Sequence, residues 1–294
     1  MASAKDLRKR ITSVKNTQQI TKAMKMVSAA KLRRAQDSIM ALRPFALELQ
    51  KVLAAVSVSA KEELNHPLLT PKEESEVKKI LVILVTSDRG LCGAFNSNII
   101  KTAQRFLKTN ASKYEKLDFA FIGKKGYEFF RSRKAGKYYQ NFFVNMKYAK
   151  AKQLAEELIG LYSNGEYDEI RFIYNEFKSA ISQKVNVETF LPVKPEEAQA
   201  ESSESTGGGS TIFEPGAKEI IDALLPKHFA THIFRIALES LASEHGARMA
   251  AMENATKNAS EMVRKLTLVY NRTRQAGITK ELLEITSGAE AQRA

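Results

Sequence analysis

The feature that most constrains this fold is an unbroken helical seam along residues 1–60. No Gly occurs before Gly90 and no Pro before Pro44, so almost nothing here stops a helix. At 1.5 Å per residue such a helix is about 85 Å long, too long to lie inside one compact domain. A partner helix must therefore cover its seam. Side chains at alternating spacings of three and four residues, typical of a coiled coil, mark this seam: Ala4, Leu7, Ile11, Val14, Gln18, Thr21, Lys25, Ser28, Leu32, Ala35, Ile39, Leu42, Ala46, Leu49, Leu53 and Val56.

The seam changes character in its first half. Over residues 18–28 its four positions are polar, while the apolar side chains Ile20, Met24 and Val27 follow a shifted face. An apolar face that rotates along a helix indicates a change of partner. We therefore expect this helix to exchange one neighbour for another there.

A second long helix is expected at the other end of the chain, over about 216–287. Pro226 is well placed as the first residue of its main segment, after a short helix that ends at residues 223–225. Two long seams at opposite ends of one chain are expected to pair antiparallel. The second seam is formed by Phe234, Leu238, Leu241, Met252, Ala255, Ala259, Met262, Leu266 and Val269.

The middle of the chain, about 77–213, alternates between strand and helix patterns. Strands are predicted at 80–85, 117–122, 169–174 and 185–191, and helices at 94–107, 126–133 and 149–162. This alternation favours a small, open, Rossmann-like α/β sheet covered by helices. We thus predict a coiled-coil helix at 1–60, a globular α/β domain at 61–215 and a coiled-coil helix at 216–294. The polar, Gly/Ser-rich segment 194–210 is expected to be a mobile loop.

Positive charge is concentrated at the N-terminus. The chain has 46 Lys+Arg and 33 Asp+Glu, a net charge of +13, and residues 1–60 hold 12 basic and 3 acidic side chains, a balance of +9. A basic helix of this kind fits a solvated surface, a nucleic-acid-binding arm or a shaft enclosed by a ring. Basic residues occur all round the helix and no aromatic residue precedes Phe45, which favours the shaft. Composition alone leaves these alternatives open.

No segment carries a convincing active site. Residues 86–96 follow a strand and open a helix, where a phosphate cradle would lie, but they match neither GxGxxG nor a P-loop. Cys92, the single cysteine, has no CxxC partner, so a packed thiol is expected. His228 and His232 have the spacing of two metal ligands on one helix face, yet nothing indicates a third. We predict no catalytic residue, no cofactor, no metal and no membrane-spanning helix.

Long motifs then give a specific resemblance. The run from Leu7 to Lys31 (LRKRITSVKNTQQITKAMKMVSAAK) and the run from Ile278 to Ala291 (ITKELLEITSGAEA) resemble the gamma subunits of F-type rotary ATP synthases, in their bacterial form. Residues 88–96 and 243–259 look like hallmarks of the same family. The resemblance extends over the whole chain.

The resemblance implies a role in a larger machine. The coiled coil would pass through a hexamer of alpha and beta subunits, and the α/β domain would bind the epsilon subunit and stand on the c-subunit ring. Proton flow would turn the ring and the shaft, which changes the three catalytic beta sites in turn. The chain itself would catalyse nothing, and the complex would lie peripherally at the cytoplasmic face of the bacterial plasma (inner) membrane. A basic coiled-coil protein that binds nucleic acid is the alternative.

The resemblance also implies contact residues. Lys22, Met24 and Lys25 would face the acidic lever region of beta. Arg274, Gln275, Thr279 and Glu281 would form an upper contact with a beta loop, in which the Arg274 guanidinium can bind a carboxylate with two hydrogen bonds. Leu282 and Ile285 would lie in an apolar sleeve at the top of the hexamer. The paired-cysteine insert of chloroplast members is missing, so thiol control of rotation is not expected.

Overall fold

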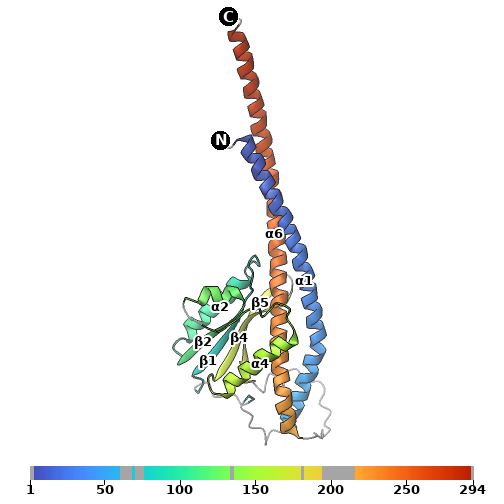
Figure 1. Cartoon of the computed structure of the whole chain (residues 1–294), viewed down its shortest axis with the longest axis vertical. Helices are drawn as coiled ribbons and strands as arrows, with labels where there is room; N and C mark the ends of the chain where they lie inside the picture. The colour runs from blue at the N-terminus through green and yellow to red at the C-terminus, as the bar shows by residue number, and fades with distance from the viewer. Residues whose placement is uncertain are drawn as a thin grey trace. The chain divides into compact units, whose positions relative to one another are not determined.

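Two long helices and one sheet make up the part of the chain that the computed structural model describes, residues 3–59, 68–69, 76–132, 136–179, 182–193 and 216–292. The helices are α1 (Ala4–Ser59) and α6 (Ala217–Ala291). The chain divides into two compact units, one of Met1–Ser28 with Arg248–Ala294 and one of Ala29–Ala247, so each long helix contributes to both (Figure 1). These helices and the sheet confirm the predicted fold class.

In the first unit, α1 and α6 pair antiparallel along a seam of contacts. Gln18 contacts Ser260, Thr21 contacts Thr256 and Lys25 contacts Glu253, so the residue numbers rise along one helix and fall along the other. Every predicted seam position of α1 in this unit is buried or partly buried. The coiled-coil pattern of α1 was therefore read correctly from the sequence.

The predicted seam of α6 was partly wrong. Met262 and Val269 are 53% and 51% exposed, whereas Val263 and Tyr270 are partly buried. The seam passes through the polar Thr256 and then keeps a spacing of three and four residues. Selecting only apolar positions put the predicted seam one residue too early at these turns.

The second unit contains a five-stranded sheet. Its strands are β1 (Lys79–Val85), β2 (Lys116–Ile122), β3 (Tyr138–Tyr139), β4 (Glu169–Phe177) and β5 (Gln183–Leu191). The order is β3-β2-β1-β4-β5, with parallel pairing except between β4 and β5. The helices are α2 (Phe95–Asn110), α3 (Lys124–Phe130) and α4 (Tyr148–Ser163). All four predicted strands are present, and the two-residue β3 is too short to show a sequence period.

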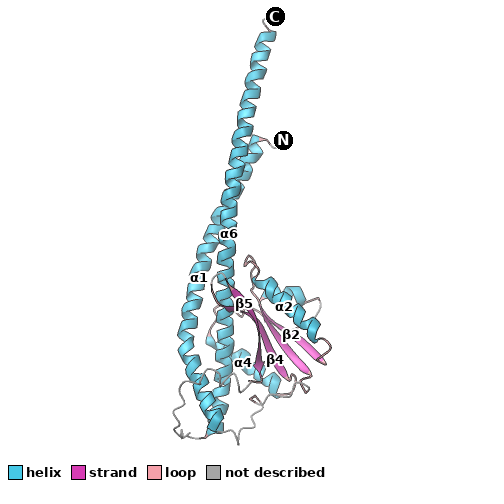
Figure 2. Cartoon of the chain, turned by 180° about the vertical axis from the view of Figure 1, so that it is seen from behind, coloured by secondary structure: helices cyan, strands magenta, loops and turns pink. Residues whose placement is uncertain are grey.

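Both faces of this sheet are covered (Figure 2). On one face, alternate residues of β1 pack with α4, α6 and the end of α1, and on the other face the intervening residues pack with α2 and α3. A strand buried on both faces needs apolar residues at every position, which explains the continuous run from Ile80 to Val85. Figure 2 shows α2 and α4 separated by the sheet.

We expected Pro226 to begin a new helical segment, but it lies inside the continuous helix α6. A proline inside a helix costs about 3 kcal/mol, because it removes a hydrogen bond and clashes with the preceding turn. The neighbouring Ile221, Leu225 and Phe229 are 0%, 1% and 0% exposed, and burial of each such side chain stabilises by about 1.5–3 kcal/mol. Packing against the sheet therefore outweighs the proline.

The described residues do not test two of the predictions made from the sequence. The expected mobile loop at 194–210 lies outside the described residues. The division into 1–60, 61–215 and 216–294 stays a prediction, since its boundaries adjoin residues that are not described. Within the described ranges, no helix is apolar over a length that could cross a bilayer.

Candidate functional site

The first candidate site is the polar stretch of the α1–α6 seam in the first unit. The Gln18 amide donates a hydrogen bond of 2.7 Å to the Ser260 hydroxyl. The Thr21 and Thr256 hydroxyls lie 2.7 Å apart, and the Lys25 ammonium lies 3.1 Å from a carboxylate oxygen of Glu253. Polar residues of α1 thus meet polar residues of the same partner helix. The expectation that the helix changes partner here was wrong, because hydrogen bonds replace apolar packing in an unbroken seam.

The apolar side chains of the same stretch are left uncovered by the seam. Ile20, Met26 and Val27 are 60%, 60% and 56% exposed. Exposed apolar side chains that gather on one helix indicate a surface for another molecule. Of the shifted face that the sequence predicted, Ile20 and Val27 are thus exposed, whereas Met24 is partly buried, so the prediction holds only in part.

The three predicted contact residues of α1 lie beside this surface. Lys22 is exposed, whereas Met24 and Lys25 are partly buried. The hydrogen bond with Lys25, together with its charge, lowers the pKa of Glu253. A partner that contacts the Lys25 ammonium would thus share it with a carboxylate of α6.

Among the described residues of this unit, no helix packs against the end of α6. Extending the register of the three contacts places Ala4, the first residue of α1, opposite Thr273. In Figure 1 α6 continues past the N-terminus of α1. All six predicted contact residues of this segment are exposed, namely Arg274, Gln275, Thr279, Glu281, Leu282 and Ile285.

This lone segment displays apolar side chains to solvent. Ile278, Leu282, Leu283 and Ile285 are 49%, 58%, 61% and 68% exposed. An isolated helix is marginally stable in water and usually depends on packing of an apolar face. The segment therefore has the composition of a helix that is surrounded by another molecule.

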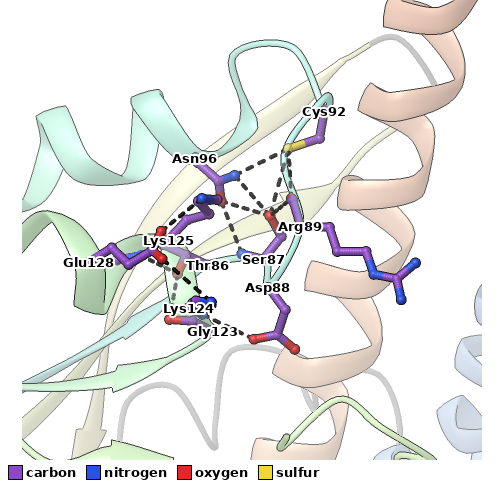
Figure 3. Close-up of polar contacts among 11 residues, drawn as sticks. Thr86, Ser87, Asp88, Arg89, Cys92, Asn96, Gly123, Lys124, Lys125 and Glu128 are labelled. Carbon is purple, nitrogen blue, oxygen red and sulfur yellow. Dashed lines mark hydrogen bonds and ion pairs between the residues drawn. The ribbon is translucent and has the colours of Figure 1, made fainter. Parts of the chain in front are cut away.

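The turn after β1 was considered as a phosphate cradle, and Figure 3 shows how its polar groups are used. At the start of α3, the Lys124 backbone N–H donates to the Asp88 carboxylate and the Lys125 N–H to the Ser87 carbonyl. The Gly126 N–H donates to the Thr86 hydroxyl over 2.9 Å. These three backbone donors at the start of α3 are therefore bound to this chain's own acceptors. This geometry favours the structural turn that we expected.

The same turn presents one apolar side chain that sequence reasoning missed. Leu91 has a left-handed backbone (φ 63°) and is 64% exposed. It lines an open depression of about 620 Å³ with Ile100, Lys101 and Phe129. Cys92 next to it is buried, and its sulfur accepts a hydrogen bond from Asn96 at 3.2 Å. In the sequence, an apolar residue between Gly90 and Gly93 could have indicated an exposed side chain in this turn.

The two histidines of α6 belong to a cluster with charged side chains of the sheet. His232 Nε2 and Arg235 Nη2 each lie 2.8 Å from Oε1 of Glu188 in β5. Burial by itself would raise the pKa of Glu188, but the hydrogen bond with His232 and the charges of His232 and Arg235 lower it to about 2. Burial, reinforced by His232 and Arg235, lowers the pKa of His228 to about 3.

This cluster does not resemble a metal site. The His228 and His232 ring centroids lie 6.1 Å apart, and His232 is engaged by a carboxylate and a guanidinium. In the described ranges, no three His, Cys, Asp or Glu side chains are grouped so that they could hold an ion. Both histidines are packed against aromatic rings, His228 against Phe229 and His232 against Phe190.

Comparison with known proteins gives a consistent result. A family model described as ATP synthase matches residues 3–292. The ATP synthase gamma chain of Bdellovibrio bacteriovorus is 50% identical over 296 residues, which cover 99% of this chain and 99% of that one. A central stalk and c-ring structure of the Tetrahymena thermophila mitochondrial ATP synthase contains a chain with a TM-score of 0.57 and 26% identity, covering 80% of this chain and 99% of that one. A Euglena gracilis mitochondrial ATP synthase structure contains one with a TM-score of 0.64 and 22% identity, covering 98% and 94%.

Proposed function

The chain belongs to the ATP synthase gamma-chain family, and we propose that it turns inside its complex as a shaft that couples proton flow to catalysis. As a gamma chain it is a non-catalytic subunit of the rotor, in a complex associated with a membrane. The family gives no support to a nucleic-acid-binding role. The excess of basic residues at the N-terminus is better explained by acidic surfaces of partner subunits.

The observation that carries the proposal is the uncovered end of α6. Beyond Thr273 no described residue of its unit covers the helix, and the apolar Ile278, Leu282 and Ile285 are about half exposed or more. A sleeve formed by the alpha and beta subunits would remove this apolar surface from water. Because apolar contact is not directional, such a sleeve would hold the helix end and still allow it to turn.

Two polar surfaces would transmit force to the beta subunits. We assign the lower one to Lys22, Met24 and Lys25, which would face the acidic lever region of beta. The upper one would consist of Arg274, Gln275, Thr279 and Glu281, with the Arg274 guanidinium on a carboxylate of a beta loop. In support, the four upper side chains and Lys22 are exposed.

The α/β domain would connect the shaft to the membrane part. It would bind the epsilon subunit and stand on the ring of c subunits, at the cytoplasmic face of the bacterial inner membrane. One elementary charge that crosses 100 mV supplies about 2.3 kcal/mol, so several proton steps must be added mechanically. Long helices that pair along a seam suit this task, because they carry a twist without separating.

Co-expression with alpha and beta subunits tests the role directly. We expect ATP hydrolysis that depends on this chain, and rotation of a bead attached to its α/β domain. If hydrolysis does not need this chain, or the bead does not turn, the role is refuted. Retardation of duplex DNA with a steep salt dependence would instead support the alternative.

Truncation before Ile278 tests the sleeve. The shortened chain should assemble with alpha and beta less stably than the full chain, because the apolar contact is lost. Replacing the polar Lys280 and Glu284, a surface ion pair of 3.6 Å on the same segment, by alanine is the matched control and should assemble normally. Unaltered assembly of the truncated chain would contradict the sleeve.

A further inference from the structure

A partly buried ionic cluster joins the sheet to α6 in the second unit, and neither the family role nor the contact residues make use of it. We call it the Glu188 cluster, and its members are Tyr174 of β4, Glu188 of β5, and His232, Arg235 and Glu239 of α6. The three α6 residues are spaced by three and four positions, so they lie on one face of the helix. The cluster thus joins two consecutive strands to a helix whose residue His232 lies 44 positions beyond Glu188.

The Glu188 carboxylate is the centre of the cluster. Its Oε1 contacts His232 Nε2 and Arg235 Nη2, both at 2.8 Å, and its Oε2 accepts a hydrogen bond from the Tyr174 hydroxyl. Arg235 also donates to Glu239 over 3.1 Å. The side chains of His232, Glu188 and Arg235 are 15%, 21% and 35% exposed. Three partners therefore hold one carboxylate, away from most of the solvent.

The surrounding contacts between α6 and the sheet are mainly apolar. Phe190 of β5 packs against Phe229 and against the His232 ring, with ring centroids 5.1 and 5.5 Å away. Apolar packing opposes separation of the two surfaces, but it depends little on direction. Hydrogen bonds to a charged group require a particular distance and angle. The Glu188 cluster therefore adds what the apolar contacts lack, a fixed rotation of α6 against β5.

A second directional contact lies further along α6. The Ser243 hydroxyl donates to the Asn175 carbonyl of β4 over 3.1 Å. This hydrogen bond between neutral groups is a weaker constraint than one to a charged group. Together the two contacts fix α6 at two points along the sheet, and the charged one dominates.

We propose that Glu188 is a positioning residue that locks α6 to the sheet, so that a torque on the α/β domain turns the helix. The proposal rests on the rotor role given above. Without this lock, the apolar surfaces of β5 and α6 yield under load, and part of the applied rotation is lost before it reaches the seam. The lock acts on coupling and leaves the chemistry at the beta sites unchanged.

The test uses the whole ATP synthase, reconstituted in vesicles with either the natural chain or its Glu188→Gln variant. ATP hydrolysis and ATP-driven proton pumping are measured on the same vesicles. We expect the ratio of pumping to hydrolysis to fall by about threefold or more, since removal of the charge at the centre of a partly buried ionic network leaves its partners unpaired. Hydrolysis per assembled complex should change less than pumping.

Glu169→Gln is the matched control. Glu169 is a buried carboxylate of the same sheet, and its Oε1 binds Arg171 Nε at 2.7 Å within β4. This variant should lose stability but keep the natural ratio, because the broken pair does not involve α6. An equal fall of the ratio in Glu169→Gln would overturn the proposal, since the effect would then reflect stability alone.

Two further variants protect the test from a failure to fold. Tyr174→Phe removes a single hydroxyl and should lower the ratio less than Glu188→Gln, and an unchanged ratio would refute the lock. Adding Arg235→Gln to Glu188→Gln should lower the ratio little further than Glu188→Gln alone, because both act through one contact. If Arg235→Gln lowers the ratio by the same factor with and without Glu188→Gln, the two residues act independently and the lock is refuted. If the complex hydrolyses ATP without this chain at all, the rotor role fails, which is a different result.

Discussion

The pKa of His228 makes the stability of this chain depend on pH in a defined way. The imidazole lies against Phe229 and His232 on α6, at ring distances of 5.6 and 6.1 Å. Burial, with His232 and Arg235 nearby, lowers its pKa from 6.5 to about 3. The folded chain therefore keeps His228 neutral at pH values where the unfolded chain protonates it. This stabilisation is complete above the unfolded pKa and is lost as the pH falls from 6.5 towards 3.

The magnitude follows from the two pKa values. At about pH 5, protonation of His228 in the unfolded state lowers the free energy of unfolding by about 2 kcal/mol relative to neutral pH. Glu239 acts in the opposite sense, because burial raises its pKa and a proton bound in the folded state stabilises that state. A comparison with a His228→Phe variant cancels Glu239, since phenylalanine keeps a flat ring and takes up no proton.

Urea unfolding of the full chain, followed by far-ultraviolet circular dichroism, measures the effect. Between about pH 7 and pH 5 the natural chain should lose about 2 kcal/mol more of its unfolding free energy than His228→Phe. The unfolding slope should be the same for both chains. If both lose the same free energy over this range, His228 is not held neutral by its surroundings and the reasoning is refuted.

The remaining predictions concern the turn after β2 and the polar seam. Gly123→Ala should cost about 3 kcal/mol or more, because φ is +94° and the new Cβ would lie 1.9 Å from the Thr86 carbonyl oxygen. Gly165→Ala is its control, with φ +72° but open space, and should cost about 1 kcal/mol; equal costs in urea unfolding would contradict the steric account. Thr21→Val should cost about 1 kcal/mol, because the hydrogen bond with Thr256 is lost. Adding Thr256→Val should recover part of that cost, and purely additive losses would show that the two hydroxyls are not coupled.

Local patterns were sufficient for most of the fold. The seam of α1 could be read from residue spacing, because a helical seam keeps its period whether its residues are apolar, as at Leu7, or polar, as at Thr21. Strand β1 could be recognised because burial on both faces requires a continuous apolar run. The resemblance at the two termini carried the family assignment, which the relatives confirm.

The errors share one physical cause. Pro226, Met262 and Val269 were judged by their own propensity or polarity, whereas packing elsewhere decides their positions. Burial of Phe229 on the sheet outweighs the cost of the proline, and Thr256 enters the seam because Thr21 faces it. Neither fact is visible in a local window of sequence.

The candidate site was likewise predicted from the sequence only in part. The contact residues from Lys22 to Ile285 came from motif resemblance, and their contacts with partners stay predictions. The exposed end of α6 emerged only when the register placed Ala4 opposite Thr273 and left the rest of the helix uncovered. Leu91 was missed because Gly90 and Gly93 indicate a turn but not the left-handed backbone that exposes the side chain between them.

By itself the sequence determined the helical seams, the strand and helix alternation and the family, because periodicity and long motifs are properties of consecutive residues. The tertiary structure decided which of these residues meet. It brought Glu188 to His232 and Arg235, over 44 and 47 positions of the chain. It also paired polar groups along a seam that the sequence had suggested would change partner. Such pairings depend on the free energy of burying both members at once, and a single stretch of sequence holds only one of them.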